Sequence, residues 1–350
     1  MEKALIAMSG GVDSSVAAYL MLRSGYDCGG MTMQLCEMSD PAADARPVAD
    51  RLQIPFTVLN GTDAFQKDVV QPFIHAYEQG LTPNPCIRCN QFIKFGVLLE
   101  QALNLGYDYI VTGHYARIRK ENDRYLLYKA ADAQKDQTYF LAGLTQHQLS
   151  HTKLPLGEIT KEQVRQIALE QGFLNARKKD SQDICFIPDG DFAGFIRRYT
   201  GREYPGGDFL DLSGKVVGRH NGAFAYTLGQ RKGLGIALGE PAYVCAKDMG
   251  KNTVTVGPNE ALFRKTLMAT DWNWLPFPAL TEPMRVTAKA RYRHIEQPAT
   301  VYPDGRVEFD EPQRAMTPGQ AVVVYDGDMV VGSGTITEVL KGAHNGNQHL

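Results

Sequence analysis

The chain has 350 residues, of which 43% are hydrophobic and 22% charged, and its net charge is -2, so the composition is that of a globular protein and gives no general argument for nucleic acid binding. The length is typical of about two or three domains. No apolar run reaches the ~18 residues of a membrane span, and the N-terminus is too short for a signal-peptide core, so we expect a cytoplasmic protein with no membrane contact.

Short apolar runs alternate with helical patterns over about the first 115 residues. The runs that we expect to form strands are residues 4–8, 29–35, 56–59 and 109–112. Apolar residues then recur at helical spacing after the first run, at Val12, Val16, Ala17, Leu20 and Met21. This alternation predicts an α/β domain with a parallel sheet, which binds its ligand at the carboxyl ends of the strands.

The later elements change in character along the chain. Residues 116–119 and 125–129 flank a polar turn and predict a hairpin, and residues 92–103 and 161–171 predict helices. From about residue 201, glycine and proline become frequent and short alternating runs replace helices. The runs at 286–292, 299–302, 307–309, 321–325 and 330–336 predict a small antiparallel barrel or sandwich.

A glycine-rich segment, Ser-Gly-Gly-Val-Asp-Ser-Ser at 9–15, lies between the first strand and the first helix. Its glycines let the backbone approach a phosphate, and the helix N-terminus supplies positive potential. The carboxylate of Asp13 is unexpected for an anion site unless a magnesium ion bridges it to phosphate. The segment does not fit the Walker A or dinucleotide-binding patterns. It resembles instead the PP-loop of ATP pyrophosphatases, which cleave ATP to AMP and diphosphate.

Three cysteines lie in positions that suggest chemistry. Cys86 and Cys89 form a C-x-x-C just before the predicted helix 92–103, and Cys185 lies about a hundred residues further on. We expect the helix N-terminus and Arg88 to lower the thiol pKa values. One thiol of a distant pair can carry a persulfide, and the other can release its terminal sulfur by forming a disulfide. We interpret the other cysteines as core filler: Cys28, Cys36 and Cys245.

Seven segments in order across the chain carry a close family resemblance. They lie at 9–15, 84–90, 112–116, 135–141, 180–187, 226–235 and 317–322. Together they resemble the tRNA-specific 2-thiouridylases, a PP-loop family. The resemblance implies a PP-loop ATP-binding domain, a small central domain and a C-terminal antiparallel β-barrel. We expect these at residues 1–197, 198–262 and 263–342, with a tail at 343–350.

The activity implied by this resemblance is ATP-dependent 2-thiolation of the wobble uridine of tRNA. The uridine C2 oxygen is adenylated, and sulfur arrives through a cysteine persulfide. The implied cofactors are ATP and Mg²⁺. The implied partners are tRNA and a sulfur donor, which is a persulfide-relay protein, a cysteine desulfurase or free sulfide. We expect the enzyme to act as a monomer.

The resemblance also implies roles for individual residues. Cys89 is the expected nucleophile, Cys185 the persulfide carrier, and Asp13 a third catalytic residue. The expected ATP-binding residues are Ala7, Met8, Ser9, Gly10, Gly11, Val12, Asp13, Ser14, Ser15, Met33 and Gly113. The expected contacts with tRNA or its target base are Asn84, Pro85, Cys86, His114, Lys135, Asp136, Gln137, Arg291, Tyr292 and Gln320. Arg291 and Arg293 are predicted to share one face of a strand and to form a phosphate platform with Tyr292.

Cys86 departs from the family pattern, in which many members have aspartate at this position. In one reading Cys86 is a tolerated substitution. In the other, Cys86, Cys89 and Cys185 hold a [4Fe–4S] cluster whose fourth iron is open to sulfide. Three further alternatives are a PP-loop ATP pyrophosphatase that acts on a small molecule, a non-catalytic nucleotide-binding or Fe–S module, and an RNA-binding protein that acts through its barrel alone.

Overall fold

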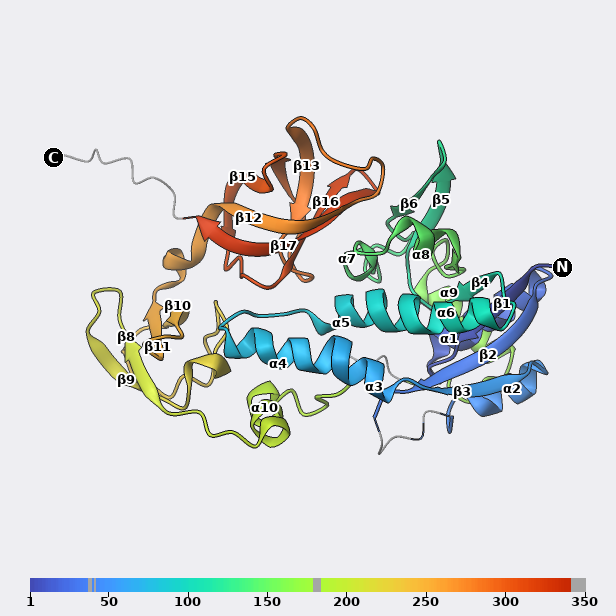
Figure 1. Cartoon of the computed structure of the whole chain (residues 1–350), viewed down its shortest axis with the longest axis horizontal. Helices are drawn as coiled ribbons and strands as arrows, with labels where there is room; N and C mark the ends of the chain where they lie inside the picture. The colour runs from blue at the N-terminus through green and yellow to red at the C-terminus, as the bar shows by residue number, and fades with distance from the viewer. Residues whose placement is uncertain (37–39, 41, 179–183, 341–350) are drawn as a thin grey trace.

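The predicted parallel sheet is present in the computed structural model, which describes residues 1–36, 40, 42–178 and 184–340 (Figure 1). It has five parallel strands in the order β3-β2-β1-β4-β7. They are β1 (Lys3–Ala7), β2 (Asp27–Gln34), β3 (Phe56–Asn60), β4 (Tyr109–Val111) and β7 (Thr152–Lys153). The second strand begins at Asp27, before the predicted residue 29, because Asp27 already pairs with Lys3 of β1.

Helices cover both faces of this sheet because successive side chains of β1 point to opposite faces. Ala4 and Ile6 pack in one core with residues of α1 (Val12–Arg23), α2 (Arg46–Leu52) and α9 (Lys161–Glu170). Leu5 packs in a second core with residues of α6 (Leu98–Asn104). The expected α/β architecture is therefore confirmed, with the predicted apolar face of the first helix turned toward the sheet.

A chain of helices runs out from the sheet and then back to it (Figure 1). It consists of α3 (Thr62–Phe65), η1 (Gln66–Val70), α4 (Gln71–Glu78), α5 (Pro85–Arg88) and η2 (Cys89–Val97), and it ends in α6. The predicted helix 92–103 is part of η2 and α6. Its first part is wound as a π-helix, in which the N–H of Leu98 bonds to the carbonyl of Ile93.

The predicted C-terminal barrel is confirmed and is closed by pairing of its first and last strands. Its strands are β12 (Phe263–Trp274), β13 (Met284–Lys289), β14 (Gln297–Val301), β15 (Arg306–Arg314), β16 (Ala321–Asp326) and β17 (Met329–Leu340). The predicted hairpin is also present, as β5 (Arg117–Glu121) and β6 (Arg124–Tyr128), and β6 pairs with β17. Tyr325 and Val330 of the barrel belong to the same core as Leu5 of the first sheet.

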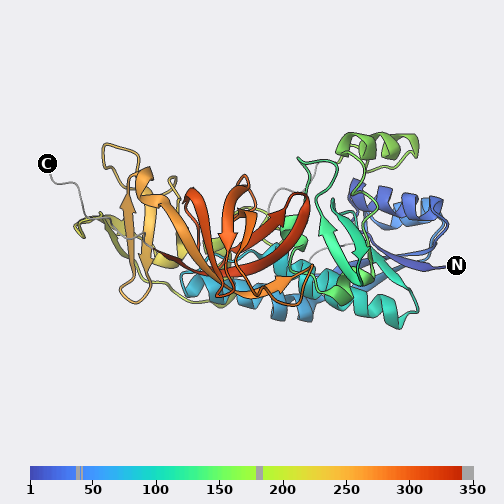
Figure 2. The same ribbon diagram turned by 90° about the horizontal axis from the view of Figure 1, so that it is seen from above.

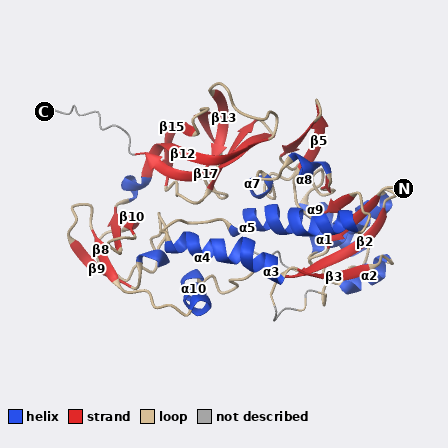
Figure 3. Ribbon diagram, viewed as in Figure 1, coloured by secondary structure: helices blue, strands red, loops and turns tan. Residues whose placement is uncertain are grey.

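A small central sheet lies at the other end of the molecule, and Figure 2 shows the three sheets along one axis. Its strands are β8 (Gly207–Leu210), β9 (Val216–His220), β10 (Tyr243–Asp248) and β11 (Thr253–Gly257). Figure 3 colours strands red and helices blue, so the strands of this sheet can be told from the remaining helices. Those helices are α7 (Thr138–Leu141), α8 (Gln146–Ser150), α10 (Phe192–Thr200), η3 (Ala223–Ala225) and η4 (Asn259–Leu262).

The described residues contain no helix that is both long and apolar enough to cross a membrane. The expected tail at 343–350 and the first part of the motif at 180–187 lie outside the described residues.

Candidate functional site

The glycine-rich loop joins β1 to α1 at the carboxyl edge of the parallel sheet. The hydroxyls of Ser14 and Ser15 each donate a hydrogen bond of 3.0 Å to the carbonyl of Gly11, which closes the loop onto the helix. Gly10 has φ +71°, and a Cβ there would lie 2.3 Å from Cβ of Asp44. A side chain at Gly10 would therefore both strain the backbone and clash. The helix N-terminus stays available as an anion site.

Asn175, which is distant in sequence, is hydrogen-bonded to this loop through its side chain. Its side-chain amide donates to the carbonyl of Gly10 at 3.0 Å and to Oγ of Ser15 at 2.9 Å, in a buried position. The oxygen of the same amide is buried without a hydrogen-bond partner among the described residues. Sequence reasoning missed Asn175, because its loop contacts lie 160 or more residues away in the chain.

The other residues predicted to bind ATP come from neighbouring strand ends. Ala7 pairs with Met31 in the sheet, and the N–H of Met8 bonds to the carbonyl of Met31 at 2.8 Å. Met33 lies near the end of β2. Gly113 follows β4, and a Cβ there would lie 2.7 Å from the carbonyl carbon of Asp13. The parallel topology thus brings these strand ends together around the loop.

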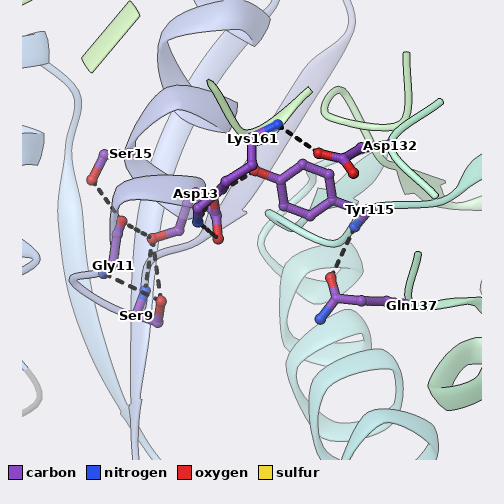
Figure 4. A network of polar contacts seen from close by, with 9 residues as sticks. Ser9, Gly11, Asp13, Ser15, Tyr115, Asp132, Gln137 and Lys161 are labelled. Atoms are coloured by element: carbon purple, nitrogen blue, oxygen red, sulfur yellow. Dashed lines mark hydrogen bonds and ion pairs between the residues drawn. The ribbon is translucent and has the colours of Figure 1, made fainter. Parts of the chain in front are cut away.

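The carboxylate of Asp13 is held by two side chains of the same domain (Figure 4). Nζ of Lys161 donates to both of its oxygens, at 2.7 and 2.8 Å, and the hydroxyl of Tyr115 donates to Oδ1 at 2.8 Å. Lys161 and Tyr115 are both buried. Neither was predicted as a site residue, because they meet Asp13 across 148 and 102 residues of sequence.

This arrangement does not fit the predicted role of Asp13 as a magnesium ligand. Both carboxylate oxygens already accept hydrogen bonds from a cationic group. The carboxylate is therefore balanced by an ammonium group of the protein.

The segment Lys135–Gln137, predicted to contact tRNA, is connected to the same network. Oε1 of Gln137 accepts from the backbone N–H of Tyr115 at 2.9 Å, and the backbone N–H of Gln137 donates to the carbonyl of Tyr115 at 2.9 Å. Asp136 accepts from Thr138 at 2.6 Å, and burial raises the pKa of its carboxyl. The predicted tRNA segment is therefore braced against the residue that holds Asp13 (Figure 4).

The C-x-x-C segment forms the junction of α5 and η2. Asn84, predicted to border the target base, is the N-cap of α5, and its side chain accepts from the N–H groups of Cys86 and Ile87. Pro85 fits the first helical position, where its missing N–H costs nothing. Cys86 is exposed and Cys89 is buried.

The thiol groups do not have the lowered pKa values that the sequence suggested. Burial raises the pKa of Cys89, and protein atoms packed around the Cys86 thiol desolvate it and raise its pKa although the residue reaches the surface. The charge of Lys94 opposes the shift at both thiols. Arg88, expected to activate the thiols, instead packs over the ring of Phe92 and donates to the carbonyl of Asp68 at 2.8 Å. Burial outweighs the helix N-terminus because a thiolate loses its hydration there.

Cys185 lies in the same electrostatic neighbourhood although it is distant in sequence. The pKa of Cys185 is raised to about 11, chiefly by burial of the thiol and next by the charge of Cys89. The charge of Lys94 opposes this shift, and that of Cys36 adds to it. Cys185 in turn raises the pKa of Cys86. The thiols of Cys89 and Cys185 are therefore within electrostatic range of each other, as are Cys36 and Lys94, which sequence reasoning did not place there.

Lys94 follows Cys89 by five residues within η2. In α-helical winding, a separation of five residues would turn the two side chains well apart. In π-helical winding, the hydrogen bonds connect residues five apart, so Cys89 and Lys94 lie about one turn from each other. The unusual winding therefore explains why the ammonium group acts on the thiols.

The predicted [4Fe–4S] ligand set does not fit this arrangement. Cys86, Cys89 and Cys185 all lie within the described residues, yet they do not form a group that could hold a metal ion. Their proximity is enough for mutual charge effects but lacks the three-point ligation that a cluster needs. We therefore derive no step through a cluster.

His114 is buried and bonded. Its Nδ1 lies 2.8 Å from Oγ1 of Thr112, and its ring packs against Phe95 with centroids 5.8 Å apart. Burial and the charge of Lys94 lower its pKa well below the usual value, so the ring is neutral. In this position it supports the strand end beside Gly113.

The predicted strand platform of Arg291 and Arg293 is wrong, because β13 ends at Lys289 and these residues lie in a turn. Arg291 is half-buried and donates to the carbonyl of Leu228 at 3.0 Å and to Oγ1 of Thr317, so it joins the barrel to the central part of the chain. Burial lowers its pKa, and its Nε has no partner among the described residues.

Tyr292 and Gln320 also make contacts between parts of the chain. The ring of Tyr292 is exposed and packs against Phe140 with centroids 4.3 Å apart. Nε2 of Gln320 donates to the carbonyl of Thr82 at 2.7 Å, just before the cysteine segment. These residues connect the barrel to the first domain beside the thiols.

Comparison with protein-family models gives three matches. They are a tRNA methyl transferase HUP domain over residues 2–189, a tRNA methyl transferase PRC-barrel domain over 193–258, and an aminomethyltransferase β-barrel domain over 264–336. Together they follow the three sheets of the structure.

Several curated relatives are similar over nearly their whole length. A tRNA-specific 2-thiouridylase MnmA from Clostridium acetobutylicum is 49% identical over 353 residues, which covers 96% of this chain and 99% of the relative. Proteins of the same name from Acetivibrio thermocellus and Moorella thermoacetica are each 50% identical, cover 96% of this chain, and are themselves covered to 99% and 100%.

Proposed function

Because this chain belongs to the tRNA-specific 2-thiouridylase family, we propose that it transfers sulfur to C2 of the wobble uridine of tRNA at the expense of ATP. The observation that carries the proposal is the coexistence of an anion-binding loop and an electrostatically coupled pair, Cys89 and Cys185, in one domain. The loop serves ATP, and the cysteine pair serves sulfur.

The proposed first step is adenylation. The C2 oxygen of uridine attacks the α-phosphorus of ATP, the bond to the β-phosphate breaks, diphosphate leaves, and N3 loses its proton. The residues of the loop at 9–15 bind the phosphates, and Ala7, Met8, Met33 and Gly113 border the adenosine. Adenylation is needed because a carbonyl oxygen is a poor leaving group. Magnesium supplied with ATP would help neutralise the departing diphosphate, and the residues of the loop at 9–15 would hold that complex.

The proposed second step is sulfur transfer. The terminal sulfur of a persulfide on Cys185 attacks C2, and the C2–oxygen bond breaks so that AMP leaves with that oxygen. The Cys89 thiolate then attacks the Cys185 sulfur, and the electron pair of the broken S–S bond stays on the sulfur attached to C2. The product regains a proton at N3. The Cys89–Cys185 disulfide is reduced by a thiol before the next cycle.

The charge effect of Cys89 on Cys185 supports this pairing, because both thiols must approach for the disulfide to form. We propose Asn84, Pro85 and Cys86 as the border of the target base, with His114, the segment Lys135–Gln137, Arg291, Tyr292 and Gln320 as the tRNA-facing set. His114 is buried and Arg291 is bound to Leu228 and Thr317, so their contribution is to hold the surface that tRNA meets.

The test is thiolation of an unmodified tRNA transcript by the full chain with ATP and a sulfur donor. A persulfide-relay protein, a cysteine desulfurase with cysteine, and free sulfide are compared as donors. We expect one 2-thiouridine, identified by nucleoside mass spectrometry, and one diphosphate for each sulfur transferred. Thiolation without ATP, or no thiolation with any donor, would contradict the proposal. Light scattering with and without tRNA tests the proposed monomer.

A further inference from the structure

The acidic residue of the phosphate-binding loop has a basic partner from another part of the domain. Lys161, at the start of α9, places its ammonium between the two carboxylate oxygens of Asp13, at 2.7 and 2.8 Å. The Lys161 side chain is only 10% exposed, whereas the Asp13 side chain is 29% exposed. Lysine is rarely buried to this degree unless it is paired, so Lys161 has a structural or functional role at the candidate ATP loop.

The position of Lys161 is fixed by its own surroundings. Thr160 and Gln163 form a capping box at the N-terminus of α9, and the backbone N–H of Lys161 donates to Oδ2 of Asp132 at 2.9 Å. The helix packs on α1, which carries Asp13 in its first turn. The ammonium therefore meets a prearranged carboxylate, as Figure 4 shows.

The charge of Asp13 is a difficulty for a polyphosphate site. The loop offers backbone N–H groups and a helix N-terminus, both of which favour an anion. An uncompensated carboxylate in the first helical turn would repel the phosphates, and this repulsion is large in a partly buried position. An ammonium bound to both oxygens removes the net charge, so that the positive potential of the loop remains.

We propose that Lys161 is a positioning residue of the ATP site, which neutralises Asp13, fixes its carboxylate toward α9 and keeps the loop receptive to polyphosphate. The inference rests on the proposed ATP-dependent function. It also assigns Asp13 to an ion pair within the protein in place of the metal-ligand role that its sequence position suggests.

The test measures ATP binding to the full chain by calorimetry in buffer with magnesium. Lys161→Met exposes the charge of Asp13, and we expect ATP affinity to fall by at least about tenfold. Combining it with Asp13→Asn removes that charge, so the double variant should recover most of the affinity. Lys161→Arg should retain much of it. The matched control is Lys251→Met, which breaks only the exposed pair with Asp248.

Thermal unfolding shows whether Lys161→Met folds. If it does not, the single variant Asp13→Asn still tests the inference. We expect Asp13→Asn to bind ATP at least as tightly as the wild type. Loss of binding in Asp13→Asn, unchanged or tighter binding in Lys161→Met, or a double variant no better than Lys161→Met would each overturn the inference. A wild-type chain that does not bind ATP would overturn the proposed function, and the inference with it.

Discussion

The hydroxyl of Tyr115 donates a hydrogen bond of 2.8 Å to Oδ1 of Asp13, and the backbone of the same residue pairs with Gln137. One residue therefore contacts both the candidate ATP loop and the segment proposed to meet tRNA. Gly113, two residues earlier, approaches the backbone of Asp13 so closely that no side chain fits between them. The strand end after β4 is thus the structural link between the two candidate substrate sites.

Tyr115→Phe tests this link, because it removes the hydroxyl and keeps the buried ring. A hydrogen bond to a charged group contributes about 1.5–3 kcal/mol, so we expect roughly a tenfold or greater loss in kcat/KM for ATP in the thiolation assay. Tyr199→Phe is the control, since Tyr199 is exposed and its hydroxyl bonds only to Gln66 in the described structure. Equal activity of Tyr115→Phe and wild type would show that the contact has no role in ATP use.

Cys185→Ser separates the two proposed chemical steps. A serine hydroxyl cannot carry a persulfide, so we expect sulfur transfer to stop while diphosphate release in the presence of tRNA continues. Cys245→Ser, in β10 of the central sheet, is the control and should leave both steps unchanged. Normal formation of 2-thiouridine by Cys185→Ser would remove that residue from the persulfide route.

The reactivity of Cys185 should depend steeply on pH. Its pKa is raised to about 11, and only the thiolate is alkylated, so the rate should rise about tenfold per pH unit from neutral pH and level off near pH 11. Lys94→Gln removes a charge that lowers this pKa, so the plateau should move to still higher pH and alkylation at pH 8 should slow. Lys94→Arg should retain the wild-type profile.

Mass spectrometry of iodoacetamide adducts on Cys185 follows this reaction at a single residue. An alkylation rate that levels off near pH 8 in the wild type would contradict the raised pKa of Cys185. Faster alkylation in Lys94→Gln would contradict the assigned charge effect.

Cys86→Ser tests the cluster hypothesis that the geometry does not favour. We expect the variant to retain thiolation with a persulfide donor within about twofold, because Cys86 lies outside the proposed disulfide chemistry. Iron and sulfide analysis of anaerobically purified wild type and variant accompanies the assay. Stoichiometric iron in the wild type, lost together with activity in Cys86→Ser, would establish a cluster and refute the persulfide route.

Much of the fold follows from local patterns. The strands of the parallel sheet were predictable from short continuous apolar runs, the hairpin from its polar turn, and the barrel from its hydrophobic period of two. The strand β12 was missed, since bulges near Arg264 and Thr270 interrupt its alternation. The run at 286–292 predicted too long a strand. Tyr292 continues the apolar alternation, although β13 ends at Lys289.

The candidate site also contains residues that local sequence patterns predicted and residues that they did not. The loop at 9–15 and the cysteines were identified from short motifs. Lys161, Tyr115 and Asn175 were not, since each meets the loop from more than a hundred residues away. The thiol pKa values also depend on burial that a helix N-terminus in the sequence does not reveal. Local sequence therefore supplied the candidate reacting groups, and only the tertiary structure showed how those side chains are held.

The pairing of β6 with β17 has a consequence for biosynthesis. Met329 pairs with Tyr128, and Tyr325 and Val330 complete a core that includes Leu5 and Leu127 of the first domain. Domains generally fold in order as the chain leaves the ribosome. Here the nucleotide-binding half keeps apolar surface uncovered until nearly the last strand has been translated. Premature termination before residue 321 would therefore leave an aggregation-prone fragment, although every residue proposed for catalysis is already present in it.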